Sequence, residues 1–318
     1  MGQTIKTSGF SNWKPSQLPD LAGKTYVITG ANSGIGYEAA RMLGERGGDI
    51  IMVCRSRAKA ETAQAKLLEN VKGSVKFILM DLSDLSSVRK AAEELRGGVT
   101  RIDALINNAG VMMTPQEKTV DGFDLQMGAN HLGHFLWTGL LIDLVEAAAG
   151  RVVALSSIAH KSKALNLDDL MTEEGYTPTK AYTQSKLANL MFVFELDRRL
   201  SASGSKAIAI ACHPGYTDTN LQSTGPAGFM KFGLAVLNKF GAQRPEAGAI
   251  PTVLATAGKE AQRGAYYGPT GIMEVRGPVS DAKVAAHALD REKQAKLWEM
   301  SETLVGHTWG LAPSEEAA

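Results

Sequence analysis

The sequence predicts an α/β fold, namely a single-domain, doubly wound parallel sheet. Short, uninterrupted apolar runs alternate along the chain with longer segments of helical spacing. This pattern is typical of strands that are buried on both faces and connected through helices. A glycine-rich turn follows the first apolar run and opens the first helical segment. Because crossovers between parallel strands are right-handed, these elements wind into a sheet with helices on both faces.

Strands and helices are expected to alternate up to Cys212. The strands are expected over residues 25–29, 50–54, 75–80, 104–107, 152–156 and 207–212, and the helices over 35–46, 58–70, 85–96, 123–148 and 182–200. Further along, residues 266–269 and 271–275 fit a last strand and its approach. Residues 281–305 fit a terminal helix that covers the sheet or contacts another subunit.

The 318 residues are within the size of one large α/β domain, and no linker composition appears before Cys212. We expect an N-terminal extension over 1–20, one domain over 21–313 and a frayed tail over 314–318. Residues 220–244 are rich in Gly, Phe, Leu and Met and depart from the strand–helix rhythm. They indicate an apolar substrate flap, with a dimer contact or ordinary core as the alternative.

The composition excludes several classes of partner. The 34 Lys and Arg residues nearly balance the 33 Asp and Glu residues, so neither nucleic acid nor an anionic membrane is expected as the main partner. Cys54 and Cys212 cannot build a disulfide framework, which favours a cytoplasmic location. The start of the chain lacks the pattern of a secretory signal, and Lys6 breaks a myristoylation pattern. No segment has the roughly 18 apolar residues of a membrane span.

The first strand–helix turn predicts a dinucleotide site. It reads Thr29-Gly30-Ala31-Asn32-Ser33-Gly34-Ile35-Gly36. Gly30 allows the sharp turn, Gly34 lets the backbone approach a pyrophosphate, and Gly36 lets the helix pack closely on the sheet. The helix N-terminus offers free N–H groups and a positive dipole end to that anion. The expected contacts come from Gly30, Asn32, Ser33, Gly34, Ile35 and Gly36.

The end of the second strand favours NADP(H) over NAD(H). An NAD site usually has an acid there to hold the ribose 2′-hydroxyl. Here Cys54 and Arg55 follow one another, and Asp49 lies at the opposite end of the strand. Arg55 can make bidentate contacts to a 2′-phosphate. Arg57 is close by, and a solvated loop is the alternative for both arginines.

Five motifs in order make the chain resemble the short-chain dehydrogenases/reductases. After the glycine turn these are Asp81-Leu82-Ser83, Asn107-Asn108-Ala109-Gly110, Tyr182-x-x-x-Lys186 and Pro214-Gly215. The segments Asn130-His131-Leu132-Gly133-His134-Phe135, Ser156-Ser157-x-x-His160 and Ser185-Lys186-Leu187-Ala188-Asn189 are similar to the retinol-dehydrogenase-like branch. The resemblance implies a Rossmann fold, and it implies that the insert at about 161–179 is one the branch shares.

The resemblance also implies residue roles. Asp81 would meet the adenine beside Leu82, and Thr219 would contact the carboxamide. Asn108, Ala109, Gly110, Pro214 and Gly215 would complete the cofactor site. The implied catalytic set is Asn130, Ser157, Tyr182 and Lys186. In it Ser157, rather than Ser156, holds the substrate oxygen, and Asn130 holds a water that connects Lys186 to solvent.

Tyr182 is the expected acid and base. Tyr182 and Lys186 are four residues apart on a predicted helix, so they share one face. A free tyrosine has a pKa of about 10, and a nearby ammonium together with a positive nicotinamide ring favours the phenolate. Tyr182 can then exchange a proton with an alcohol or carbonyl oxygen, while Lys186 also holds the nicotinamide ribose.

His131 and His134 are three residues apart, but no H-E-x-x-H pattern or third ligand accompanies them. We therefore expect structural histidines and no metal.

The predicted function is the interconversion of an alcohol and a ketone or aldehyde by hydride transfer with NADP(H). The apolar 220–244 segment indicates a lipophilic or aromatic substrate. The alternatives are a C=C reductase on the same platform and a non-catalytic NADPH-binding regulator. The family resemblance implies a homodimer or homotetramer.

Overall fold

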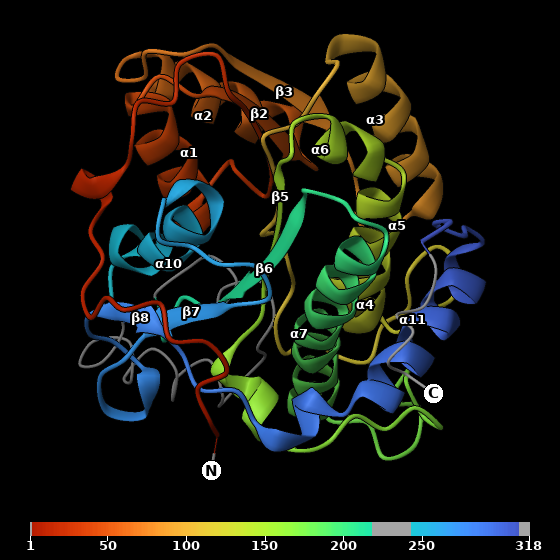
Figure 1. Cartoon of the computed structure of the whole chain (residues 1–318). Helices are drawn as coiled ribbons and strands as arrows, with labels where there is room; N and C mark the ends of the chain where they lie inside the picture. Colours follow the sequence, from red (N-terminus) through yellow and green to blue (C-terminus); the bar gives the residue numbers. More distant parts are fainter. Residues whose placement is uncertain (1, 218–242, 312–318) are drawn as a thin grey trace.

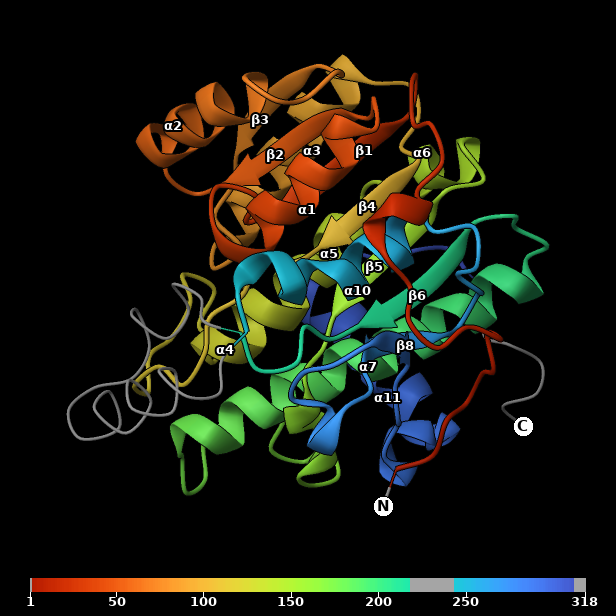
Figure 2. The same ribbon diagram turned by 90° about the vertical axis from the view of Figure 1, so that its left-hand side faces the viewer.

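One eight-stranded sheet forms the centre of the computed structural model, which describes residues 2–217 and 243–311 (Figures 1 and 2). The strands are β1 (Thr25–Thr29), β2 (Asp49–Cys54), β3 (Val75–Leu79), β4 (Ala104–Asn107), β5 (Arg151–Leu155), β6 (Ile208–Cys212), β7 (Tyr266–Pro269) and β8 (Val279–Asp281). Their order is β3-β2-β1-β4-β5-β6-β7-β8, and only the last pair, β7 with β8, is antiparallel. The order reverses between β1 and β4, so a crevice opens where these two strands end.

Helices cover both faces of the sheet and divide the apolar side chains into two cores. The helices are α1 (Gly34–Glu45), α2 (Arg57–Leu68), α3 (Leu85–Gly98), α4 (Leu125–Met127), α5 (Gly133–Gly139), α6 (Ile142–Ala147), α7 (Pro178–Ala202), α10 (Pro245–Ala257) and α11 (Arg291–Val305). Figure 1 shows α1 and α10 on one side and α3, α5 and α7 on the other. Val27 of β1 packs into one core, whereas Tyr26 and Ile28 pack into the other. Strands buried on both faces in this way confirm the predicted fold class.

The predicted helix over 123–148 is wrong as a single element. The chain instead forms α4, a π-helix over Gly128–Leu132, α5 and α6, with a break at Leu140 and Leu141. The side chain of Asp124 caps the start of α4, and the π turn contains Asn130, whose side chain bonds to the loop after β4. The helical spacing of apolar residues continues through these breaks, which is why the pattern did not reveal them.

Two predictions near the C-terminus are also corrected. Residues 266–269 form β7, but it is not the last strand, because β8 follows it; residues 271–275 lie between the two, with a 3-10 turn over Ile272–Glu274 in which Met273 and Glu274 have left-handed φ values of 54° and 57°. The terminal helix begins at Arg291 rather than near residue 281, with Asp290 as its N-cap. Before it, Ala286–Leu289 forms a 3-10 turn.

The N-terminal extension packs along the edge strand β8 (Figure 1). Gln3 pairs with Val284, and the backbone N–H of Trp13 donates to the Val279 carbonyl at 3.0 Å. The Ser8 hydroxyl donates to the Asp281 carboxylate at 2.7 Å. The extension therefore covers backbone groups that an edge strand would otherwise leave open.

Within the described ranges, none of the helices combines the length and apolar character that crossing a membrane requires. Most of the predicted flap over 220–244, together with Thr219 and the tail over 314–318, lies outside the described residues.

Candidate active site

A cleft opens at the carboxyl ends of β1, β4 and β5, where the strand order predicts ligand binding. Most of the predicted cofactor residues line it: Gly30, Asn32, Ser33, Gly34, Ile35, Gly36, Arg55, Asn108, Ala109, Gly110, Tyr182, Lys186 and Pro214. A connecting recess is lined by Asp81 and Leu82, together with Arg55 and Gly110. Gly215 instead lies in the wall of a second, neighbouring cavity.

The glycine turn has the geometry of a phosphate cradle. Gly30 and Gly34 adopt left-handed φ values of 69° and 58°. A Cβ atom on Gly36 would lie 2.5 Å from Asn108 Nδ2, so only glycine allows this approach of α1 to the β4 loop. Ser33, the N-cap of α1, makes no side-chain capping bond, which leaves the first N–H groups of the helix to a ligand. The turn therefore fits a dinucleotide pyrophosphate.

Two cations lie where the cofactor ribose is expected. Arg55 follows β2 and forms no ion pair with the described residues. Lys59 lies on the wall of the same cleft and of an adjoining recess with Lys66. Arg57 instead lies over the Phe77 ring at 5.6 Å and within 3.9 Å of Glu61. Sequence reasoning missed Lys59, because it lies on α2 rather than directly after β2 and no motif marks it.

The loops after β1 and β4 are held together by a short network. Thr29 Oγ1 accepts hydrogen bonds from the backbone N–H groups of Asn108 and Ala109, at 2.9 and 3.0 Å. Asn108 Nδ2 donates to the Thr29 carbonyl at 2.7 Å. A Cβ on Gly110 would lie 2.9 Å from Asn130 Oδ1 and 3.5 Å from Lys186 Nζ. Gly110 therefore lies directly beside two of the predicted catalytic residues.

The two serines after β5 have different surroundings. Ser156 is buried, and its hydroxyl donates to the Lys186 backbone carbonyl at 2.7 Å. Ser157 lines a second cavity beside the cofactor cleft, and burial raises the pKa of Tyr182 while a side-chain hydrogen bond to Ser157 partly opposes that rise. Its Oγ also accepts from the Ala159 N–H at 3.2 Å, which caps the turn Ile158–Lys161. This placement supports Ser157, rather than Ser156, as the residue nearer the chemistry.

Tyr182 and Lys186 lie one turn apart on α7, with Lys186 Nζ 6.0 Å from the centre of the Tyr182 ring. Burial raises the pKa of Tyr182, an effect that opposes the hydrogen bond from Ser157. Burial also lowers the pKa of Lys186 to about 8. Lys186 Nζ donates to the Leu155 carbonyl at 3.1 Å. With its pKa raised above 10, the tyrosine of the protein alone is a phenol at neutral pH.

Asn130 lies in the π-helix and is fully buried. Its side-chain oxygen accepts from the Val111 N–H at 2.7 Å, and its side-chain nitrogen donates to the Val111 carbonyl and to Ser185 Oγ, each at 2.9 Å. The amide thus ties the β4 loop to α7. Its backbone carbonyl accepts from His134 Nδ1 at 3.0 Å and has a second lone pair for a water.

The two histidines of this region have structural partners. His131 Nε2 bonds to Ser301 Oγ, and His134 Nε2 bonds to Thr29 Oγ1, each at 2.9 Å. Burial lowers the pKa of His131 to about 4 and that of His134 to about 3, so both rings are neutral. Among residues 2–217 and 243–311, no three His, Cys, Asp or Glu side chains are grouped so that they could hold a metal ion.

A second cavity, of about 970 Å³, adjoins the cofactor cleft. Its apolar lining includes Met112, Met113, Ile158, Tyr216 and Met273. Ile35, Ser156, Tyr182 and Pro214 line both the cavity and the cofactor cleft, so Tyr182 lies where the two meet. The volume and lining suit a lipophilic substrate.

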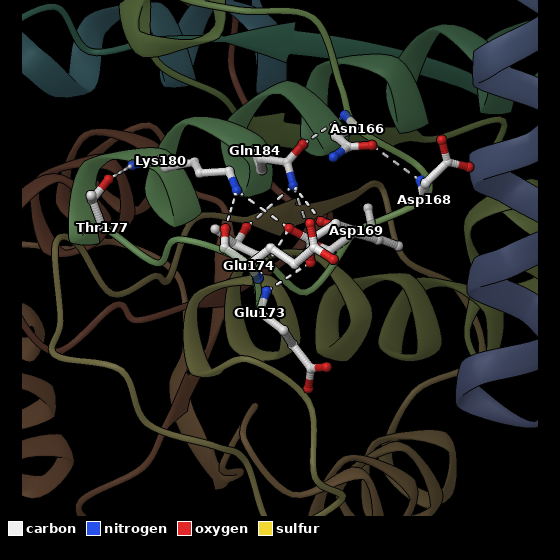
Figure 3. A network of polar contacts seen from close by, with 10 residues as sticks. Asn166, Asp168, Asp169, Glu173, Glu174, Thr177, Lys180 and Gln184 are labelled. Atoms are coloured by element: carbon white, nitrogen blue, oxygen red, sulfur yellow. Dashed lines mark hydrogen bonds and ion pairs between the residues drawn. The ribbon is translucent and has the colours of Figure 1, made fainter.

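The insert between Ser157 and Tyr182 is anchored to α7 through Lys180 and Gln184 (Figure 3), which lie two residues before and two residues after Tyr182 in the sequence. Gln184 Oε1 accepts from the Asn166 N–H at 2.7 Å, and its Nε2 donates to the Asp169 carbonyl at 3.0 Å. Lys180 Nζ donates to the Glu174 carbonyl at 2.6 Å and to the Asp169 carboxylate at 3.3 Å. The predicted insert therefore supports the helix that carries the predicted catalytic pair.

The fold and its two joined cavities define a dinucleotide-binding α/β protein with a place for a second, apolar ligand. The family model described as short chain dehydrogenase matches residues 24–227, and the chain belongs to that family. It is an oxidoreductase of alcohols and carbonyl compounds, acting on CH–OH groups.

The relatives place the chain in the retinol-dehydrogenase-like branch, which confirms the predicted resemblance. It is 40% identical to retinol dehydrogenase 13 of Homo sapiens over 90% of this chain and 86% of that protein. It is 36% identical to human retinol dehydrogenase 14 over 90% of this chain and 87% of that protein.

Solved structures agree on the fold. A putative uncharacterized protein from Mycobacterium paratuberculosis is 40% identical, with a TM-score of 0.79, over 94% of this chain and all (100%) of that one. The RhlG/NADP active-site complex of Pseudomonas aeruginosa is 23% identical, with a TM-score of 0.62, over 80% of this chain and 96% of that one.

Proposed function

We propose that this enzyme interconverts a lipophilic alcohol and its aldehyde or ketone with NADP(H), using Tyr182 as acid and base. The observation that carries the proposal is the position of Tyr182 in the walls of both the cofactor cleft and the apolar cavity. The curated relatives are named for retinol, a lipophilic alcohol. The size and lining of the cavity are in keeping with a substrate of that kind.

The residues of the cleft fit the cofactor. The glycine turn and the open N-terminus of α1 would hold the pyrophosphate, and Asp81 with Leu82 would line the adenine recess. Arg55 and Lys59 would hold a ribose 2′-phosphate, which NAD lacks. Thr219, outside the described residues, stays a proposed contact to the carboxamide. When bound, NADP(H) supplies or accepts the hydride.

The side chains of the site would handle the substrate oxygen and its proton. Ser157 Oγ would donate a hydrogen bond to that oxygen, and the Tyr182 phenol would give it a proton during reduction. In oxidation the same proton returns to Tyr182. Lys186 would hold the nicotinamide ribose, and the Asn130 carbonyl would hold the water that links Lys186 to solvent.

We also propose that residues 21–313 form one domain, because a single sheet carries both cavities. The two buried free cysteines support a cytoplasmic location. A homodimer or homotetramer is proposed from the family alone.

The experiment is a panel of lipophilic and small aldehydes and ketones, retinal included, assayed by NADPH and NADH absorbance. We expect turnover of lipophilic carbonyls with NADPH and an alcohol product. Tyr182→Phe should abolish turnover while NADPH binding is retained. Saturation of a C=C bond, or NADPH binding without any turnover, would reject the proposal in favour of the C=C reductase or the regulator.

A further inference from the structure

A buried carboxylate in the wall of the apolar cavity has no part in the proposed reaction. Glu274 is only 6% exposed and ends the 3-10 turn Ile272–Glu274. Its carboxylate accepts a hydrogen bond from Lys161 Nζ and another from the Lys283 backbone N–H at 2.9 Å. Lys161 ends the turn that Ser157 begins. The carboxylate is therefore tied to the segment that carries the proposed substrate-binding serine.

The other side of Glu274 faces the loop after β6. The Gly215 N–H donates to His213 Nδ1 at 3.2 Å, so the proton of the neutral imidazole lies on Nε2. Burial lowers the pKa of His213, which keeps the ring neutral. Nε2 lies 3.5 Å from the Glu274 carboxylate and makes no hydrogen bond among the described residues, so Glu274 is its close polar neighbour rather than its hydrogen-bond acceptor. The path from Gly215 to Lys161 therefore consists of a hydrogen bond to His213, a close contact from His213 to Glu274, and a hydrogen bond from Lys161 to Glu274.

The backbone beside the turn Ile272–Glu274 also contacts the loop after β6. The Tyr216 N–H donates to the Val275 carbonyl at 2.8 Å. A Cβ on Gly215 would lie 2.3 Å from that carbonyl oxygen, so only glycine permits the contact. Met273 and Glu274 hold left-handed φ values of 54° and 57°, a conformation that costs free energy unless surrounding contacts impose it. Here the contacts of the Glu274 carboxylate and the Val275 carbonyl impose it.

We propose that Glu274 is a positioning residue that couples the cofactor loop at Pro214 and Gly215 to the substrate turn at Ser157–Lys161. Pro214 lines both the cofactor cleft and the apolar cavity, whereas Gly215 and Lys161 line only the apolar cavity, so Pro214 is the end of the path that reaches the cofactor. A ligand that orders one end of the path thereby orders the other, and NADPH and substrate bind more tightly together than apart. The inference rests on the proposed function, which assigns these two segments to cofactor and substrate.

A purely structural ion pair is the competing explanation. Buried pairs are often no more stabilising than apolar replacements, so the pair need not exist for stability. A structural role would change the melting temperature alone. A positioning role must change binding at a site that the altered side chain does not touch.

The test is to change the substrate end and to measure cofactor binding. Lys161→Met removes the ammonium, and the NADPH Kd is measured by fluorescence titration of the full chain. Glu274→Gln removes the carboxylate charge at the centre of the path. Glu292→Gln is the matched control, because it makes the same change in the exposed pair with Lys296 on α11, at 3.1 Å.

We expect Lys161→Met and Glu274→Gln each to weaken NADPH binding about 10-fold, within the usual range of coupling between sites. The double variant should bind NADPH no more weakly than Glu274→Gln alone, because both substitutions act through one path. Both variants should also raise the KM of the carbonyl substrate. The control should change neither quantity.

An unchanged NADPH Kd in Lys161→Met, or additive losses in the double variant, would overturn the coupling. If Glu274→Gln fails to fold, Lys161→Met alone still decides the question. If the unaltered enzyme reduces no carbonyl in the panel, the proposed function fails, and the NADPH titrations still test the path by themselves.

Discussion

At the residue scale, Tyr182 shows how burial and charge compete. Burial raises its pKa, and the hydrogen bond from Ser157 only partly opposes this. Lys186 is itself desolvated, which lowers its pKa to about 8 and so weakens its hold on a proton. The motif predicts which residues meet, but the direction of each pKa shift depends on burial, which the sequence does not state.

The protonation of Tyr182 predicts opposite pH profiles for the two directions. Reduction needs the phenol, so its kcat should hold through neutral pH and fall only in alkaline solution. Oxidation needs the phenolate, so its kcat should rise as pH increases. Both are measured between about pH 6 and 10 at saturating substrate, because kcat reports the bound complex. An oxidation rate that falls between pH 7 and 9 would contradict this role.

The burial of Lys186 predicts that replacing it with an uncharged side chain stabilises the folded protein, although the variant loses activity. Its folded pKa of about 8 lies below the ordinary 10.5, so the folded protein loses about 3 kcal/mol by holding it charged at pH 7. This penalty disappears as pH rises from the folded value towards the unfolded one. Lys186→Met leaves the Leu155 carbonyl with its bond from Asn189 Nδ2 at 3.2 Å.

We therefore expect Lys186→Met to raise the free energy of unfolding of the cofactor-free protein by up to about 3 kcal/mol at pH 7, and by only about 1 kcal/mol at pH 10. Urea unfolding at both pH values measures this, with the exposed Lys296→Met as control. The same variant should lose activity. If Lys186→Met were less stable than the unaltered protein at pH 7, burial of the charged Lys186 would not be destabilising.

At the element scale, the α7 region depends on contacts that no short motif contains. Gln184 is 5% exposed, and its side chain bonds to the Asn166 N–H, the Asp169 carbonyl and the Thr172 hydroxyl. These bonds fix the insert against the helix two residues beyond Tyr182 (Figure 3). The sequence predicted the insert and the helix separately, but not their docking, because the partners are distant backbone groups.

Removal of this docking should lower both stability and turnover. Gln184→Ala leaves buried donors and acceptors unpaired, at about 1–3 kcal/mol. We expect a lower melting temperature and a lower kcat, with NADPH binding little changed. The matched control is Lys118→Met, which removes the exposed pair with Glu173 at 3.1 Å, because exposed pairs contribute little. Equal effects of the two variants would mean that the insert does not support Tyr182.

The strands show what periodicity predicts well. Residues 25–29 and 104–107 are strands with the predicted bounds, and the other four predicted strands differ by one residue at one or both ends. The 123–148 region shows the limit, since the helix widens to a π turn over Gly128–Leu132, where Asn130 bonds to the distant Val111, and is interrupted at Leu140 and Leu141. Local patterns predict local structure, whereas a distortion that accompanies a tertiary contact is not visible in them.

At the scale of the whole molecule, the net charge of +1 conceals a local positive region. Arg55 and Lys59 both reach the cofactor cleft, which the sequence revealed only for Arg55. Lys59 belongs to a different element, α2, and it entered the site when that helix packed beside the glycine turn. The motifs predicted the backbone of the cleft and Arg55, whereas the position of Lys59 in the cleft became evident only from the packed structure.

These cations predict how the whole fold responds to cofactor. The cleft joins the half of the sheet containing β1 to β3 with the half containing β4 to β6, so a ligand in it should oppose global unfolding. NADP at about 100 times its Kd should stabilise the protein by about 2.7 kcal/mol. NAD at the same concentration should give a smaller rise in melting temperature, because it leaves Arg55 and Lys59 without a phosphate partner.

Two variants separate the phosphate contacts from the rest of the cleft. Arg55→Asp and Lys59→Ala should each reduce the rise in melting temperature that NADP gives. Lys59→Ala should leave the rise that NAD gives unchanged. Arg55→Asp should leave it unchanged or increase it, since an acid at that position can accept a hydrogen bond from the ribose 2′-hydroxyl. Thermal unfolding with each nucleotide measures both effects. Arg57→Asp is the control, because its side chain lies by Phe77 and Glu61. Equal protection by NADP and NAD in the unaltered protein would refute a 2′-phosphate site, even if both nucleotides bind the glycine turn.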